Sequence, residues 1–166
     1  SNDNIFSVRY KGKEVKFFVE NKNDLIQSCH VKGFFFDIDD MESCLPYIPA
    51  NATVLDIGAN VGNHSIFFSI QENIRKVIPF EINPTAYQIL RASVKESQLK
   101  NIDLRYIGIG LSHAPGTVRL KHSTSDNLGA TCFTEESTDG IGQLFETNSL
   151  DNLLSSDISV DFMKLD

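Results

Sequence analysis

The stretch Val54-Leu55-Asp56-Ile57-Gly58-Ala59-Asn60-Val61-Gly62-Asn63 decides the fold of this 166-residue chain. Residues 53–57 are apolar and β-branched at their start, which predicts a short buried strand. Gly58 allows a sharp turn at the carboxyl end of that strand, and Gly62 allows a ligand or the next helix to approach the main chain closely. A helix is expected to begin at about Asn63. A helix N-terminus beside a glycine turn suits an anionic or polar ligand group, at the edge where parallel strands end.

The spacing of the glycines indicates which ligand this turn suits. A dinucleotide fingerprint requires G-x-G-x-x-G, but Asn60 and Asn63 occupy its second and third glycine positions. The pattern is instead D-x-G-x-x-x-G, and it begins at Asp56. The predicted second strand ends at Glu81, an acid placed to bind two ribose hydroxyls. Because Asp56 would repel a pyrophosphate but tolerate an amino group and a sulfonium centre, the residues favour S-adenosylmethionine over NAD.

Several segments, in order along the chain, strengthen this interpretation. They are VLDIGANVGNHS, PFEINP, IGLSHAPGTVRL, NLGAT, NSLDNLL and VDFMKLD, and they span most of the sequence after Thr53. With these segments the chain resembles the FkbM-type S-adenosylmethionine-dependent methyltransferases. The resemblance implies a Rossmann-like class I methyltransferase fold, an α/β fold with parallel strands in the order 3-2-1-4. The expected cofactor-binding residues lie in the glycine turn, at the end of the second strand and after the third strand: Asp56, Gly58, Ala59, Asn60, Gly62, Asn63, Glu81, Ile82, Asn83, Gly108, Gly110 and Leu111.

The sheet is expected to contain four parallel strands. Their predicted ranges are 53–57, 76–80, 102–109 and 159–165. Pro79 lacks a ladder donor, so the second strand is expected to fray or bulge at its end. In the family the sheet continues beyond the fourth strand, so the resemblance implies a sheet that is truncated there. Whether the chain is a fragment of a longer enzyme stays open. The free outer edge of 159–165 would then favour self-association.

The remaining segments are predicted from local patterns. Apolar residues on both sides of Lys11-Gly12-Lys13 predict a β-hairpin, and short helices follow it up to Pro46. Asn83 and Pro84 predict the start of a longer helix that runs to about Leu99. Residues 123–142 are polar and turn-rich, which predicts a long loop. We therefore divide the chain into an N-terminal hairpin and helical extension, 1–52, and a cofactor-binding core, 53–166.

Methyl transfer to an oxygen nucleophile needs a group that removes the acceptor's proton. Asp166, at the end of the fourth strand, is the first candidate for this base. His64, directly after the glycine turn, is the second, although a residue in a first helical turn also commonly packs or hydrogen-bonds locally. The acidic run 37–42 is either a solvated helix start or an acidic rim near the cofactor's sulfonium. No metal is required, and no cluster with ligand spacing is visible in the sequence.

Composition and charge limit the partners that the protein could bind and the cellular compartment in which it could work. Of the residues, 41% are hydrophobic, and no apolar run is long enough to span a membrane. The net charge is −7 and the sequence contains no basic cluster, which argues against nucleic acid as a partner. Cys29, Cys44 and Cys132 lack C-x-x-C spacing, which is typical of reduced thiols in a cytoplasmic protein.

Three hypotheses of function remain. The first is an S-adenosylmethionine-dependent methyltransferase that methylates a hydroxyl on a sugar, lipid or natural product, so that its partner is a small-molecule or glycan acceptor. The second is a truncated, non-catalytic nucleotide-binding module. The third, an NAD-dependent oxidoreductase, is disfavoured by Asn60 and Asn63.

Overall fold

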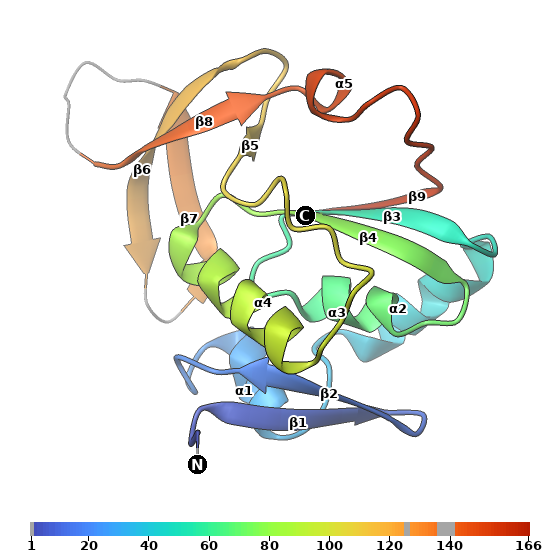
Figure 1. Cartoon of the computed structure of the whole chain (residues 1–166). Helices are drawn as coiled ribbons and strands as arrows, with labels where there is room; N and C mark the ends of the chain where they lie inside the picture. The colour runs from blue at the N-terminus through green and yellow to red at the C-terminus, as the bar shows by residue number, and fades with distance from the viewer. Residues whose placement is uncertain (1, 125–126, 136–141) are drawn as a thin grey trace.

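A parallel three-stranded sheet forms the centre of an α/β fold (Figure 1). The computed structural model describes residues 2–124, 127–135 and 142–166, and for 121–124 and 127–135 it describes the main chain only. Strand β3 (Ala52–Ile57) lies between β4 (Ile74–Phe80) and β9 (Phe162–Leu165), and all three run parallel. The first expected strand therefore lies between the second and the fourth, as predicted.

The expected third strand, 102–109, is not formed. Ile102 makes a single parallel bridge to Val77. Val77 donates its N–H to the Asn101 carbonyl oxygen at 2.9 Å, and its own carbonyl accepts from the Asp103 N–H at 2.8 Å. Consecutive turns follow in place of a strand. The predicted order 3-2-1-4 is thus present as 2-1-4, with one bridge in the place of strand 3.

Pro79 explains why this ladder stops. The next step of a parallel ladder would use the N–H of Pro79 and the N–H of Arg105. Proline has no N–H, and the Arg105 N–H donates instead to Asp103 Oδ1 at 3.1 Å. The expectation that Pro79 would fray its own strand is wrong, because Pro79 and Phe80 stay in register with β3. The missing N–H of Pro79 lies on the opposite edge of β4 from β3, where it ends the pairing with residues 102–109.

The N-terminal hairpin is confirmed. Strands β1 (Ile5–Tyr10) and β2 (Lys13–Phe18) are antiparallel. Lys11 and Gly12 join them with φ of 45° and 80°, the positive angles that a tight two-residue hairpin turn requires. Two hydrogen bonds tie β2 to the next layer: Phe18 N–H to Ser93 Oγ at 2.9 Å and Lys16 N–H to Ser97 Oγ at 2.8 Å.

Helices fill the space between the hairpin and the sheet (Figure 1). They are α1 (Leu25–Val31), α2 (Ile38–Cys44), the 3₁₀ turn η1 (Leu45–Tyr47), α3 (Asn63–Ser69) and α4 (Pro84–Glu96). Side chains cap two of these helices: Asp24 Oδ2 accepts from the Ile26 and Gln27 N–H groups, and Asn83 Oδ1 accepts from the Thr85 N–H, as expected of the helix start at Asn83 and Pro84.

One hydrophobic core joins the hairpin, the helices and the sheet. Its buried members include Val8, Phe17, Phe35, Val54 and Phe67. The Phe35 ring lies edge-on to both Phe17 and Phe67, with centroid distances of 5.7 and 5.5 Å. Burying each of these rings stabilises the fold by about 1.5–3 kcal/mol. Residues from both expected parts of the chain, 1–52 and 53–166, therefore pack in the same core.

A second sheet covers the upper left of the molecule in Figure 1. It consists of β5 (Gly110–Leu111), β6 (Gly116–Thr124), β7 (Asn127–Glu135) and β8 (Leu144–Asn148), in the order β5-β8-β6-β7. The expected loop 123–142 is therefore wrong at 123–124 and 127–135, where pairing between β6 and β7 satisfies the main chain of this polar segment. Residues 125–126 and 136–141 of that loop lie outside the described residues. Helix α5 (Leu150–Leu153) begins after Ser149, whose side chain accepts from the Asn152 N–H.

Strand β9 lies at one edge of the described central sheet. Its side chains alternate: Phe162 faces α3, where its ring lies 5.8 Å from that of Phe68, while Met163 and Leu165 are 45% and 72% exposed. Each helix among the described residues is too short or too polar to cross a bilayer.

Candidate functional site

The glycine turn at the end of β3 has the backbone that the sequence predicts. Gly58 and Gly62 have φ of 76° and 92°, where residues with a Cβ are strained. The N–H groups of Gly58 and Ala59 both lie 2.9 Å from the carbonyl oxygen of Phe80, which locks the turn onto β4. A Cβ on Gly62 would lie 3.0 Å from Leu90 Cγ. Gly62 therefore serves the close packing of α4, one of its two predicted roles.

Glu81 connects this turn to the end of β4. Its Oε1 accepts from the Asn60 N–H at 2.7 Å, and its Oε2 accepts from the Asn83 N–H at 2.8 Å. Burial raises the pKa of Glu81, and the main-chain N–H donors oppose that rise. The Ile82 main-chain N–H also acts on this carboxylate. A carboxylate has about four lone-pair sites, so three N–H donors leave room for about one further donor.

The turn at residues 108–111, at the end of the expected third strand, packs beside Glu81. The Gly108 N–H donates to the Glu81 carbonyl oxygen at 2.8 Å, and Gly108 has a φ of 87°. A Cβ on Gly110 would lie 2.7 Å from Ile82 Cδ1, so only glycine fits there without a shift. Leu111 packs in a cluster with Phe80. The structure thus brings together the predicted residues on both sides of Glu81, although the third strand is absent.

A charged network lies under the glycine turn. Asp56 is fully buried, and its Oδ2 accepts from Ser65 Oγ at 2.6 Å. The Lys164 ammonium lies 3.6 Å from Asp56 Oδ1 and 3.3 Å from Asp166 Oδ2. Burial lowers the pKa of His64; the carboxylates of Asp56, Asp37 and Asp166 act to raise it, and Lys164 acts to lower it. Both predicted bases, Asp166 and His64, therefore belong to one network.

Two buried oxygens at the glycine turn make no hydrogen bond within the described residues: Asp56 Oδ1 and Asn60 Oδ1. The Lys164 ammonium lies 3.6 Å from Asp56 Oδ1, so Asn60 Oδ1 is the acceptor of this pair that a ligand can reach. A buried acceptor without a donor is unfavourable by about 1–3 kcal/mol. Acceptors suit a ligand that brings donors, such as an ammonium group and hydroxyls. A pyrophosphate brings acceptors only. The residues present therefore fit S-adenosylmethionine better than a dinucleotide.

Two predicted contact residues use their side chains inside the protein. Asn63 Oδ1 accepts from the Phe36 N–H at 3.0 Å and lies 2.9 Å from His30 Nε2, and its Nδ2 donates to the Phe36 carbonyl. Asn83 caps α4. Because its side chain is engaged in this way, Asn63 could contact a cofactor only through its main chain.

Sequence reasoning did not identify two residues of the network, Ser65 and Lys164. It named Asp37 only as part of the acidic run 37–42, for which an acidic rim near the sulfonium is one of two interpretations; the structure places Asp37 among the carboxylates that act on His64. Lys164 could have been found from the sequence, because it lies two residues before Asp166 on a predicted strand and so shares its face. Nothing in the sequence places Ser65 beside Asp56.

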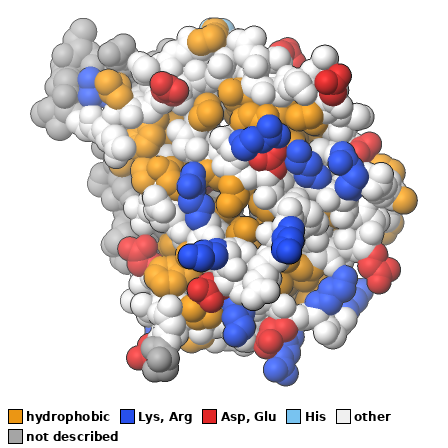
Figure 2. Space-filling view, viewed as in Figure 1, with side chains coloured by type: hydrophobic (Ala, Val, Ile, Leu, Met, Phe, Trp, Pro, Cys, Tyr) orange, Lys and Arg blue, Asp and Glu red, His pale blue; other side chains and the backbone are white. Residues whose placement is uncertain are grey.

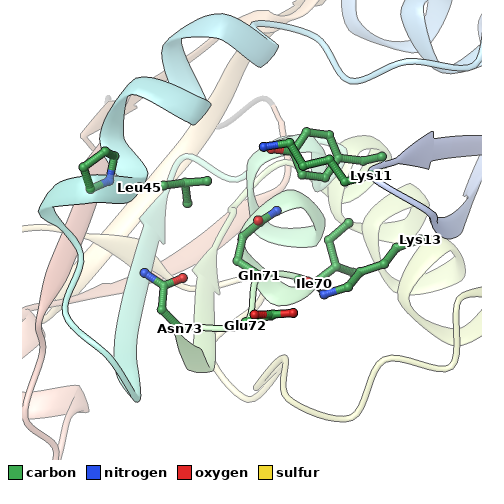
Figure 3. Close-up of a pocket in the computed structure, with 9 residues that line it drawn as sticks. Lys11, Lys13, Leu45, Ile70, Gln71, Glu72 and Asn73 are labelled. Atoms are coloured by element: carbon green, nitrogen blue, oxygen red, sulfur yellow. Dashed lines mark hydrogen bonds between the residues drawn. The ribbon is translucent and has the colours of Figure 1, made fainter.

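Two further hollows lie away from this network. The larger, of about 560 Å³, is enclosed by the hairpin turn, η1 and the end of α3 (Figure 3). Figure 3 shows Lys11 and Lys13 from the hairpin on one side and Gln71, Glu72 and Asn73 on the other. Lys13 Nζ donates to the Ile70 carbonyl at the C-terminal end of α3. This is a favourable place for a cation at a helix end, and it gives Lys13 a structural role.

The second hollow, of about 470 Å³, is basic. Its lining includes Arg75, Lys76, Lys100 and Arg105, with the carboxylate of Asp103 among them. Lys76 and Arg105 pair with Asp103 at 3.2 and 2.7 Å, and hydrogen bonds, above all from Arg105, lower the Asp103 pKa to about 2. Figure 2 shows Lys and Arg side chains gathered on the face over β4 and the segment after α4. Folding thus forms a small basic cluster from residues that the sequence keeps apart.

Comparison with known proteins shows that part of this chain is structurally similar to parts of several solved structures. No family model matches the sequence, and no curated protein matches it. Among solved structures, aTrm5 in complex with tRNALeu has a TM-score of 0.42 at 20% identity, over 65% of this chain and 28% of that one. TYW2 from Pyrococcus horikoshii, in complex with MeSAdo, has 0.42 at 16% identity, over 60% and 34%. SMU.1697c from Streptococcus mutans, in complex with SAH, has 0.36 at 20% identity, over 42% and 37%. The chain therefore spans well under half the length of these proteins.

Proposed function

We propose that this chain carries the cofactor site of an S-adenosylmethionine-dependent methyltransferase with a Rossmann-like class I fold of the FkbM type. The observation that carries the proposal is the position of Glu81. Its carboxylate joins the loop after β3 to the loop after β4, through the Asn60 and Asn83 N–H groups, and its remaining lone pair would accept from a ribose hydroxyl.

The other residues of the site support a cationic cofactor. When bound, S-adenosylmethionine supplies a methyl group that is already activated on a sulfonium. Asp56 favours a positive charge nearby through its field, since its carboxylate is too deeply buried for direct contact. Asn60 Oδ1, which makes no hydrogen bond among the described residues, would accept from the cofactor. Gly58 lets Asp166 lie close to the turn, because a Cβ at position 58 would be 3.2 Å from Asp166 Cβ. Gly108, Gly110, Leu111 and Ile82 would line the adenine side.

The acceptor proposed is a hydroxyl on a sugar, lipid or natural product. Its proton would pass to the Asp166 carboxylate, which is 72% exposed and lies next to Gly58. His64 is the second candidate, because burial lowers its pKa and keeps the ring able to accept a proton at neutral pH. Beyond removing this proton, the protein would align the acceptor oxygen with the methyl group and exclude water.

The proposed partners are small molecules or glycans, and no nucleic acid. The basic hollow lies at the start of β4, away from Glu81, and Asp103 offsets part of its charge. Two of its four cations, Lys76 and Arg105, pair with Asp103, which leaves Arg75 and Lys100. DNA-binding proteins with a strong salt dependence make about 6–10 phosphate contacts, so this cluster is too small for such binding. We further propose self-association through the edge of β9, where Met163 and Leu165 are exposed. A cytoplasmic location fits Cys29 and Cys44, which are free thiols.

Two experiments test the proposal in sequence. Titration calorimetry of the chain with S-adenosylmethionine, S-adenosylhomocysteine and NAD should show binding of the first two and none of the third. Transfer of a labelled methyl group to a panel of hydroxyl acceptors then separates an enzyme from a non-catalytic binding module. Binding of NAD in preference to S-adenosylmethionine, or of neither, would refute the assignment.

A further inference from the structure

Among the described residues, Lys164 is the one cation that acts on the His64 ring, and the sequence pattern did not assign it a role. Phe162, two residues earlier, packs against Phe68 of α3. Because side chains on a strand alternate, Lys164 also faces α3, over the first turn that carries His64 and Ser65. The parallel register pairs Lys164 with Asp56 on the neighbouring strand. Three elements, β3, α3 and β9, therefore converge on this ammonium group.

The two carboxylates that Lys164 contacts differ in their surroundings. Asp56 is 0% exposed, and one of its oxygens has only the Ser65 hydroxyl as a donor. The other oxygen has no hydrogen bond and lies 3.6 Å from the ammonium. Asp166 is 72% exposed, and its Oδ2 lies 3.3 Å from the same ammonium. Lys164, itself 17% exposed, is thus the link between a buried structural acid and an accessible one.

A buried carboxylate is very unfavourable without a counter-charge. Asp56 and Asp166 would also repel each other, since each carboxylate has an oxygen within 4 Å of the same Lys164 nitrogen. Without the lysine, the Asp166 side chain would turn toward solvent and the negative charge around His64 would rise. The charged groups that act on His64 are Asp56 from β3, Asp37 before α2, and Lys164 and Asp166 from β9.

We propose that Lys164 is the positioning residue of this site: its ammonium group bridges the carboxylates of Asp56 and Asp166 and sets the charge balance around the His64 imidazole. It holds Asp166 beside the glycine turn, where a base for an acceptor hydroxyl is needed. It also opposes three carboxylates that would otherwise favour the imidazolium, which has no proton-accepting nitrogen. The place of Lys164 in catalysis rests on the proposed methyltransferase function, but its effect on His64 does not.

The test is an NMR titration of the His64 ring in the ligand-free chain, with the resonance assigned through His64→Gln. Lys164→Met should move the midpoint of the titration upward by about one pH unit, the low end of the effect of a charge within roughly 4–6 Å. Asp166→Asn should move it downward, and Lys164→Arg should restore the wild-type midpoint because the charge is kept. If Lys164→Met fails to fold, Lys164→Gln takes its place.

The outcomes separate this inference from the proposed function. An unchanged midpoint in Lys164→Met, or an equal shift in Lys164→Arg, would overturn the positioning role. A shifted midpoint in a chain that does not bind S-adenosylmethionine would support the role of Lys164 and refute the methyltransferase. In an active preparation, Lys164→Met should move the acid limb of the pH–rate profile in the same direction as the titration, a change that a purely structural residue would not cause.

Discussion

Replacement of Glu81 tests the cofactor site most directly. Glu81→Gln keeps the shape and one carbonyl acceptor but removes the charge, whereas Glu81→Ala leaves the Asn60 and Asn83 N–H groups without their acceptor. Losing the hydrogen bond to a ribose hydroxyl should weaken S-adenosylmethionine binding by about 1–3 kcal/mol, or roughly 5–150-fold in Kd. In Glu81→Ala the two unpaired N–H groups should also lower the free energy of unfolding by about 2–5 kcal/mol.

The pH dependence provides the control for this prediction. Burial raises the pKa of Glu81 above that of an ordinary glutamate, and only the ionised carboxylate keeps a lone pair for the ribose. Binding to the wild type should therefore weaken as the pH falls through this raised pKa, while Glu81→Gln should show a flat profile in that window. Calorimetry measures both. Equal affinity of wild type and folded Glu81→Gln at pH 7, or the same acid decline in both, would remove Glu81 from the site.

Three further predictions concern the turn and the core. Gly58→Val should abolish cofactor binding in calorimetry while circular dichroism still shows a folded chain, because a β-branched residue resists a φ of 76°; retained affinity would contradict this. Gly62→Ala should lower the unfolding free energy by about 1–3 kcal/mol in urea, since φ is 92° and Leu90 Cγ lies 3.0 Å from the new Cβ; an unchanged midpoint would count against the close packing. Burial lowers the pKa of His30 from 6.5 to about 4, so the unfolded state binds the proton first and stability should fall with pH below 6.5, by about 1.4 kcal/mol at pH 5.5 and about 2.5 kcal/mol at pH 4.5. His30→Gln should remove this part of the decline, and an identical decline in the variant would refute the assignment.

The local features of the fold could be predicted from the sequence because they depend on neighbours along the chain. The hairpin turn needs positive φ at Lys11 and Gly12, and the caps Asp24 and Asn83 act on N–H groups two or three residues away. The turn after β3 needs a glycine at position 58. In each case the determining interaction spans a few residues, so the sequence contains both partners.

The pairing of distant segments could be predicted only in part. The order of β4, β3 and β9 followed from a resemblance, while the loss of the third strand depended on Pro79 facing the segment 102–109. The long polar loop was a wrong prediction for a related reason. A strand such as β7 is stabilised by its ladder with β6, and that partner is not visible in its own composition.

The sequence by itself determined the glycine turn, the acid at the end of β4 and the candidate bases, because each is a residue type at a fixed distance from a strand end. Only the tertiary structure decided their electrostatics. It buried Asp56, placed Lys164 between Asp56 and Asp166, and turned the side chain of Asn63 into the core. It also gathered Arg75, Lys100 and Arg105 around one hollow in an acidic protein. Charges interact through space with a strength set by distance and burial, and neither quantity exists until the strands and helices pack.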